Sequence, residues 1–229
     1  MGEKYPKWLL VEGKNDVPAI ASFMGHWTAW LGPKDKDKWP VYIEAAGSDG
    51  ELLAEGYLSN QLKRSGMEAL GMVIDANGNC AGRWQRVRQL CSGFFSAMPE
   101  KLPLSGLIHT EPGKPRFGLW VMPDNTSSGM IETFLRLLVP NQNDPVWLYA
   151  QDAAKTAKER GAPYKDVHVH KAHIHTWLAW QDEPGQPLGD ALKSRKVFDP
   201  KSAAAKSFAD WFIELFELER LAAGHNWRG

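Results

Sequence analysis

Short apolar runs alternate with amphipathic segments along the first half of the chain. The runs at 8–11 and 70–74 hold only apolar residues and glycine, which is typical of strands buried on both faces of a parallel sheet. A third strand is predicted at 39–46. Apolar residues at helical spacing follow each strand, and they predict helices at 17–30, 51–63 and 81–90. Three consecutive strand–helix units predict a parallel sheet wound with right-handed crossovers.

The second half of the chain begins with two more strands and then becomes helical. The apolar segments 104–108 and 117–122 flank a turn-rich stretch, and we expect them to form a hairpin at the edge of the sheet. Helical periodicity then predicts further helices at 130–139, 147–160, 172–181 and 202–223. We find no internal repeat and no low-complexity linker. The predicted organisation is one domain, residues 1–229, with an α/β core over 1–125 and a mainly helical elaboration over 126–229.

Composition narrows the class of protein without identifying its function. The chain has 229 residues, of which 43% are hydrophobic and 24% charged, as in ordinary soluble globular proteins. Lys plus Arg equals Asp plus Glu at 27 each, so no overall basic field indicates nucleic acid, although a local basic groove remains possible. Cys80 and Cys91 are too few for a disulfide framework. Without a signal peptide or a membrane-length apolar stretch, a cytoplasmic protein with no membrane partner is expected.

Acidic residues follow two of the predicted buried strands. Glu12 ends the first strand and Asp75 follows the third, with Asp16 and Asn77 close behind them in sequence. Open α/β sheets place their ligands at the carboxyl ends of the strands, so these side chains are expected to converge. Carboxylate and amide oxygens on rigid strand ends suit Mg²⁺ or Mn²⁺. Lys14 is an alternative partner for Glu12.

Two short motifs carry a resemblance to a known family. The segment Glu12-Gly13-Lys14-Asn15-Asp16 resembles the Glu-Gly-x-x-Asp signature of the TOPRIM domain, and Asp75-Ala76-Asn77 resembles its Asp-x-Asp motif. TOPRIM is the metal-binding module of topoisomerases, bacterial primases and OLD-family nucleases. More closely, the chain looks like a bacterial family of small stand-alone TOPRIM-like proteins of unknown function, distantly related to OLD nucleases. That likeness extends through 122–125, 129–132, Lys171 and 176–180.

The resemblance implies a fold and a chemistry. The fold would be a TOPRIM-like, doubly wound and mostly parallel sheet with helices on both faces. Glu12, Asp75 and Asn77 would hold Mg²⁺ or Mn²⁺ for phosphodiester cleavage of DNA or RNA, with Glu132 completing a second metal site and Lys171 stabilising charge on the phosphate. Asn77 departs from the family pattern, because an amide in place of the second Asp brings no charge and is expected to weaken metal binding.

Simpler structural roles compete with these assignments. Glu12 and Lys14 could form a surface ion pair, Asp16 could serve only as a helix cap, and Glu132 could favour a helix dipole. Lys171 could be an ordinary solvated lysine. A second hypothesis of a different class is therefore a non-catalytic regulatory or interaction protein that retains the TOPRIM scaffold. The neutral net charge and Asn77 favour it.

Other motifs are excluded or left open. The chain is too short for a topoisomerase, and two cysteines cannot build the zinc module of a primase. The segment after Asp75 lacks the glycine and the closing acid of an EF-hand, and Gly13-Lys14 lacks the first glycine of a Walker A loop. Four alternating histidines, predicted on an extended segment, could bind Zn²⁺ or phosphate, or simply be satisfied by their surroundings; they are His168, His170, His173 and His175. Any partner chain and the oligomeric state stay open.

Overall fold

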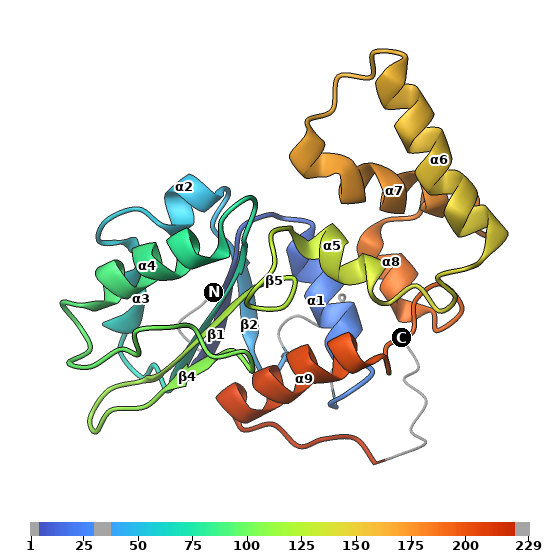
Figure 1. Ribbon diagram of the computed structural model, residues 1–229. Coiled ribbons are helices and arrows are strands. Elements are labelled where there is room, and N and C mark those ends of the chain that lie inside the picture. Colours follow the sequence, from blue (N-terminus) through green and yellow to red (C-terminus); the bar gives the residue numbers. More distant parts are fainter. Residues whose placement is uncertain (1–4, 30–37, 223–229) are drawn as a thin grey trace.

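A computed structural model describes residues 5–29 and 38–222 of the protein. Its described residues form one five-stranded sheet in the order β2-β1-β3-β5-β4 (Figure 1). The strands are β1 (Lys7–Val11), β2 (Tyr42–Ala45), β3 (Ala69–Asp75), β4 (Leu107–His109) and β5 (Arg116–Met122). The first four in that order are parallel, and β4 pairs antiparallel with β5 at the edge. The predicted α/β class, mostly parallel sheet and edge hairpin are confirmed.

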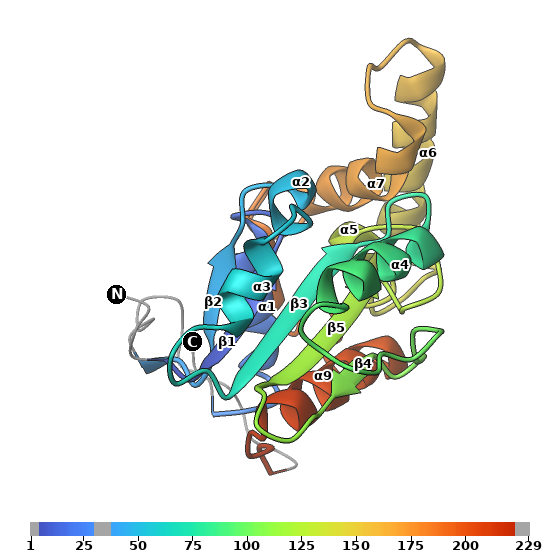
Figure 2. The ribbon, with the colours of Figure 1, turned by 90° about the vertical axis from the view of Figure 1, so that its left-hand side faces the viewer.

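The sheet separates two hydrophobic cores. Successive side chains of a strand point to opposite faces, so Leu9 and Val11 enter one core while Trp8 and Leu10 enter the other. Figures 1 and 2 show helices on both faces. One face carries α1 (Asp16–Met24) and α9 (Ala203–Phe216), and the other carries α2 (Asp49–Leu52), α3 (Tyr57–Leu62) and α4 (Cys80–Cys91). The apolar runs exist because both faces of these strands are covered.

The remaining helices build up one end of the molecule. They are α5 (Ile131–Arg136), α6 (Pro145–Glu159), α7 (Val169–Leu178) and α8 (Leu188–Lys193). Helix α8 packs on α1, and α7 packs on both α5 and α6. The α6–α7 hairpin, residues 145–178, projects from the body (Figures 1 and 2). Within the described ranges, no helix is both long enough and apolar enough to cross a membrane.

Several predicted boundaries are wrong for local reasons. The helix predicted at 51–63 is two short helices, because Gly56 between them has a φ of 81° that a helix cannot contain. The strand predicted at 104–108 begins only at Leu107, after Gly106 at a φ of 83°. Helix α9 ends at Phe216 because Glu217 is left-handed, with a φ of 46°. Helix α8, between the proline-rich stretch and α9, was not predicted, and positions 30 and 223 of the predicted helices lie outside the described residues.

Two strand glycines allow α9 to lie against the sheet. A Cβ built on Gly118 would lie 2.3 Å from Cδ2 of Leu215, and one on Gly71 would lie 2.8 Å from Cζ of Phe216. Both helix residues are fully buried, so neither side chain has free space to move into. The absence of side chains at these glycines therefore sets how closely α9 approaches β3 and β5.

We predict that Gly118→Ala lowers the free energy of unfolding by about 1–3 kcal/mol, as overpacking of a filled core does. Urea unfolding of the variant and the parent protein measures this. Gly93→Ala is the matched control, since a Cβ there meets nothing within 4 Å and should change stability little. Equal stability of both variants would show that α9 can shift away from β5 at no cost.

Candidate functional site

A cavity of about 560 Å³ lies at the carboxyl end of β1 and β3. Five of the six predicted site residues line it, although they come from the residue after β1 and from α1, β3, α5 and α7: Glu12, Asp16, Asp75, Glu132 and Lys171. Lys14, Asp49 and His175 line it as well. The structure thus brings together acids that are up to 120 positions apart in the chain (Glu12 and Glu132).

Backbone amides fix three of the carboxylates. Oε1 of Glu12 accepts a hydrogen bond from the backbone N–H of Asp75 at 3.0 Å, and Oδ1 of Asp75 accepts one from Ile131 at 3.0 Å. Oδ2 of Asp16 accepts one from Gly13 at 2.8 Å. The other oxygen of each carboxylate takes part in no hydrogen bond among the described residues. Each acid is therefore held by one oxygen and keeps the second for a ligand.

The predicted capping role of Asp16 is wrong. Asp16 is the first residue of α1, and Asn15 occupies the N-cap position without a side-chain hydrogen bond. The Asp16 carboxylate instead closes the turn at Gly13. This geometry keeps Asp16 beside the end of β1 and within the cavity lining.

Burial and mutual repulsion disfavour the ionised form of the three acids. Burial raises the pKa of Glu12 to about 7, against the lowering effect of the Asp75 amide and of Arg83. The pKa of Asp75 lies well above its usual value because of burial and of the neighbouring charges of Glu12, Asp16 and Glu132. Burial, followed by Glu132, also raises the pKa of Asp16. The positively charged side chains of the protein therefore do not balance the negative charge of these three carboxylates.

Glu132 behaves differently, because it has a cation of its own. Its side chain is 3% exposed, and its Oε1 lies 2.7 Å from Nζ of Lys171 and 3.9 Å from Nε2 of His175. Burial opposes its ionisation, but His175 and Lys171 hold the pKa of Glu132 below its usual value. Although burial acts against it, the Glu132 carboxylate raises the pKa of Lys171. Lys171 is thus ion-paired rather than only solvated, and Glu132 is engaged by side chains of α7.

The four histidines do not form a common site. The histidine segment predicted as extended is a 3-10 turn followed by α7, which covers residues 172–178 of the helix predicted at 172–181. Ile174, Trp177 and Leu178 bury one side of this helix, which packs on α6. His170 lies 3.1 Å from a guanidinium nitrogen of Arg136 and 3.0 Å from Oγ1 of Thr133.

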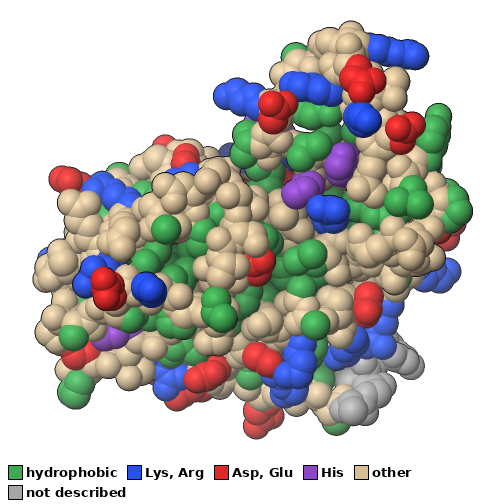
Figure 3. All heavy atoms as spheres, viewed as in Figure 1, with side chains coloured by type: hydrophobic (Ala, Val, Ile, Leu, Met, Phe, Trp, Pro, Cys, Tyr) green, Lys and Arg blue, Asp and Glu red, His purple; other side chains and the backbone are tan. Residues whose placement is uncertain are grey.

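His173 lies next to His170, with the ring centroids 6.0 Å apart, whereas His175 lies in the acidic cavity. The His173 ring packs edge-on against Trp147, and only His175 among the four lines the acidic cavity. Burial, and then Arg136, lowers the pKa of His170, and burial, and then His170, lowers that of His173. Figure 3 shows histidine side chains beneath the projecting α6–α7 hairpin.

Asn77 is the predicted ligand that the structure leaves outside. It is not among the residues that line the cavity. Its backbone pairs with Gly129 in both directions at 2.8 Å, at a φ of 49°. Among all described residues, no group of three or more His, Cys, Asp and Glu side chains is arranged so that it could hold a metal ion. A metal here would depend on one or two carboxylates and on water.

Sequence reasoning missed two members of the cavity. His175 follows Lys171 by four residues and shares its helix face, a spacing that was not used because Lys171 falls just before the helix predicted at 172–181. Asp49 begins α2 and accepts a 2.7 Å hydrogen bond from Arg83, which lowers the pKa of Asp49. Lys14 lines the cavity without forming the alternative ion pair with Glu12.

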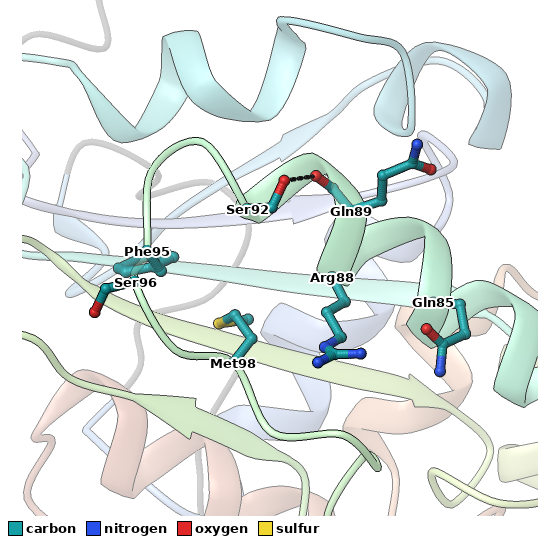
Figure 4. Close-up of a pocket in the computed structure, with 7 residues that line it drawn as sticks. All are labelled: Gln85, Arg88, Gln89, Ser92, Phe95, Ser96 and Met98. Carbon is teal, nitrogen blue, oxygen red and sulfur yellow. Dashed lines mark hydrogen bonds between the residues drawn. The ribbon is translucent and has the colours of Figure 1, made fainter.

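A second cavity, of about 360 Å³, lies beside the C-terminal half of α4 (Figure 4). It is lined by glutamine and serine side chains together with Arg88, Phe95 and Met98. No carboxylate lines it and no strand end opens into it. A further cavity, of about 450 Å³, lies beside β2 and α1, and a single carboxylate, that of Glu44, lines it. The acidic cavity, where several carboxylates converge, is therefore the candidate functional site.

We predict that Glu12→Gln stabilises the metal-free protein at pH 8 by about 1–3 kcal/mol. Glutamine keeps the acceptor for the Asp75 amide and removes the buried charge. Because folding raises the pKa of Glu12 from 4.5 to about 7, the cost of its charge is absent below pH 4.5 and complete above pH 7. Urea unfolding with EDTA at pH 4.5 and pH 8 should show the gain only at pH 8.

Asp49→Asn is the matched control for Glu12→Gln. The Asp49 carboxylate lines the same cavity, but Arg83 lowers its pKa. Replacing this carboxylate by an amide should therefore not raise the free energy of unfolding at pH 8. A loss of stability in Glu12→Gln at pH 8 would contradict the electrostatic account of the cavity.

We predict that Lys171→Met destabilises the protein at pH 8 by about 1–3 kcal/mol, less than for a fully buried pair because Lys171 is half exposed. The double variant Glu132→Gln/Lys171→Met should recover most of this loss. The pair's contribution is present above pH 4.5 and is lost as the pH falls through the lowered pKa of Glu132. Additive effects in this double-mutant cycle would show that the two side chains do not interact.

Comparison with known proteins adds a family but no function. No curated protein and no solved structure matches the chain significantly. One family model, described as Protein of unknown function (DUF3226), matches residues 6–217. Because this match covers the sheet, the cavity and all but the ends of the chain, the protein belongs to the DUF3226 family.

Proposed function

We propose that the protein is a Mg²⁺- or Mn²⁺-dependent phosphodiesterase of TOPRIM-like type that cleaves DNA or RNA. The observation that carries the proposal is the undercompensated acid group: Glu12, Asp16 and Asp75 line one cavity, and the pKa of each is raised. A divalent cation would compensate the charges that the protein leaves unbalanced. The two acids of the short motifs also stand at the ends of adjacent parallel strands, as the resemblance requires.

The donor set fits a hard cation with few protein ligands. Glu12, Asp16 and Asp75 each keep one oxygen outside the hydrogen bonds of the described residues. Mg²⁺ usually retains several waters and takes only one or two carboxylates, so a group of three or more closely placed ligands is not required. We assign Glu12 and Asp75 as direct ligands and Asp16 as a partner of bound water. A cation held by these acids would polarise a phosphoryl oxygen and lower the pKa of a bound water.

Two lysines supply the positive side of the cavity. Lys171 is half exposed, and the neighbouring carboxylates of Glu132, Asp75 and Asp16 help to raise its pKa, so it stays charged and can bind a non-bridging phosphate oxygen. Lys14 lines the cavity beside Glu12 and can bind a second one. We assign Glu132 to the anchoring of Lys171 rather than to metal, because its carboxylate is already engaged by α7.

The second candidate is a non-catalytic interaction protein on the same scaffold. Asn77 lies outside the cavity lining, and the formal net charge is +0. Both observations favour a site weaker than that of an efficient nuclease. The two candidates differ in cleavage rather than in fold, so one set of measurements separates them.

We predict that the purified protein binds Mn²⁺ in calorimetric titration at pH 8 and cleaves single- or double-stranded DNA or RNA with Mg²⁺ or Mn²⁺. Glu12→Gln and Asp75→Asn should each reduce cleavage by about 100-fold or more. Affinity should fall as the pH drops below 7, because protons compete for acids whose pKa is raised. Glu44→Gln is the matched control, a strand-end acid on β2 outside the cavity, and should leave binding and cleavage unchanged.

The outcomes of this experiment are distinct. Binding without cleavage of any of the four nucleic acids would support the non-catalytic candidate. Absence of both binding and cleavage would overturn the metal-dependent site. Cleavage that survives Glu12→Gln and Asp75→Asn would point to a contaminating nuclease.

A further inference from the structure

Resting on the phosphodiesterase activity proposed above, we propose that His175 is its general acid, which donates a proton to the leaving oxygen while Glu132 orients the ring. His175 is not part of either short motif at the strand ends. The inference comes from the side chains that α5 and α7 bring to the cavity.

His175 lies where a proton donor to a bound phosphodiester would be needed. It lines the same cavity as Glu12 and Asp75, and its side chain is 51% exposed. Lys171, four residues earlier on α7, faces the same way, because positions i and i+4 of a helix are neighbours. A phosphate held by Lys171 would therefore lie close to the His175 ring.

The buried carboxylate of Glu132 lies next to the imidazole ring of His175. Nε2 of His175 lies 3.9 Å from Oε1 of Glu132, which is longer than a hydrogen bond. Catalytic hydrogen bonds are often long before substrate binds and shorten in the complex. Nδ1 makes no hydrogen bond among the described residues, so with Nε2 beside Glu132 it is the ring nitrogen that we assign to proton donation.

The charged groups around the cavity leave His175 as the proton donor. Besides His175, the charged side chains that line the cavity are Glu12, Lys14, Asp16, Asp49, Asp75, Glu132 and Lys171. The proposed function assigns Glu12 and Asp75 to the metal, Asp16 to its bound water and Lys14 to the phosphate. Asp49 is paired with Arg83. The carboxylate of Glu132 holds the proton on Lys171, which suits a fixed positive charge rather than a donor. His170 and His173 are engaged by Arg136, Thr133 and Trp147.

The proposed step balances. Water attacks phosphorus, and the bond from phosphorus to the leaving oxygen breaks, with its electron pair moving onto that oxygen. The imidazolium of His175 gives its proton to the oxygen, which departs as an alcohol. The proton shed by the attacking water passes to solvent, and solvent reprotonates the ring. Diester and water become monoester and alcohol.

The test compares two leaving groups. A nitrophenolate leaves without a proton, whereas the sugar oxygen of a nucleic acid needs one. We expect His175→Asn to cut the cleavage of an oligonucleotide by about 100-fold or more, and the cleavage of bis-p-nitrophenyl phosphate by less than about 5-fold. His168→Asn, in the 3-10 turn outside the cavity, should leave both rates unchanged.

Every other outcome overturns the assignment. Equal loss on both substrates means that His175 supports the structure or the metal site, and an unchanged Mn²⁺ affinity then selects the structural role. Equal retention on both means that the ring does not donate the proton. If the parent protein cleaves neither substrate, the proposed function itself fails. If the parent cleaves both and only the leaving-group contrast is missing, the function stands without this residue.

Discussion

The cost of placing carboxylates at the ends of buried strands governs this structure. Glu12 and Asp75 follow strands whose apolar residues are covered on both faces, so neither acid reaches bulk water freely. The protein satisfies one oxygen of each with a backbone amide but supplies too little positive charge. A buried charge without a partner is costly in free energy. This cost favours the protonated form of both acids and so raises their pKa. A sequence selected only for stability would carry amides here.

The Glu132–Lys171 ion pair connects the carboxyl end of the sheet, where the acids lie, to helix α7. Glu132 is the second residue of α5 and follows Ile131, whose backbone amide donates to Asp75, and Lys171 extends from α7. The same contact compensates the charge of one of the four acids and links α7 to α5 beside the cavity. The α6–α7 hairpin is therefore positioned by the site itself as well as by apolar packing on α5. The cavity lining thus combines different layers of the fold, with Glu12 and Asp75 at strand ends and Lys171 and His175 on a helix.

The sequence predicts the strands better than the helices, for a physical reason. Runs such as 8–11 and 70–74 are apolar throughout because both faces are buried, and this pattern has few alternatives. The convergence of Glu12 with Asp75 follows from parallel strands alone. By contrast, the break at Gly56 depends on one backbone angle, and the polar histidines hide the first turn of α7, which begins at Val169 rather than at residue 172. The pairing of Glu132 with Lys171 and His175 depends on how α7 crosses α5, which no local pattern encodes.

Asn77 occupies a position of the Asp-x-Asp motif but does not line the cavity. An Asp-x-Asp motif places its second acid two residues after the strand, yet here that position turns at a φ of 49° to pair its backbone with Gly129. This pairing brings the segment before α5 against the end of β3, and so aligns the Ile131 amide with Asp75. Asparagine adopts the left-handed region more readily than most residues, whereas a further carboxylate would add to the repulsion around Asp75. Asn77 thus has a structural role at the end of β3, and in the proposed metal site the ligands would be Glu12, Asp75 and water.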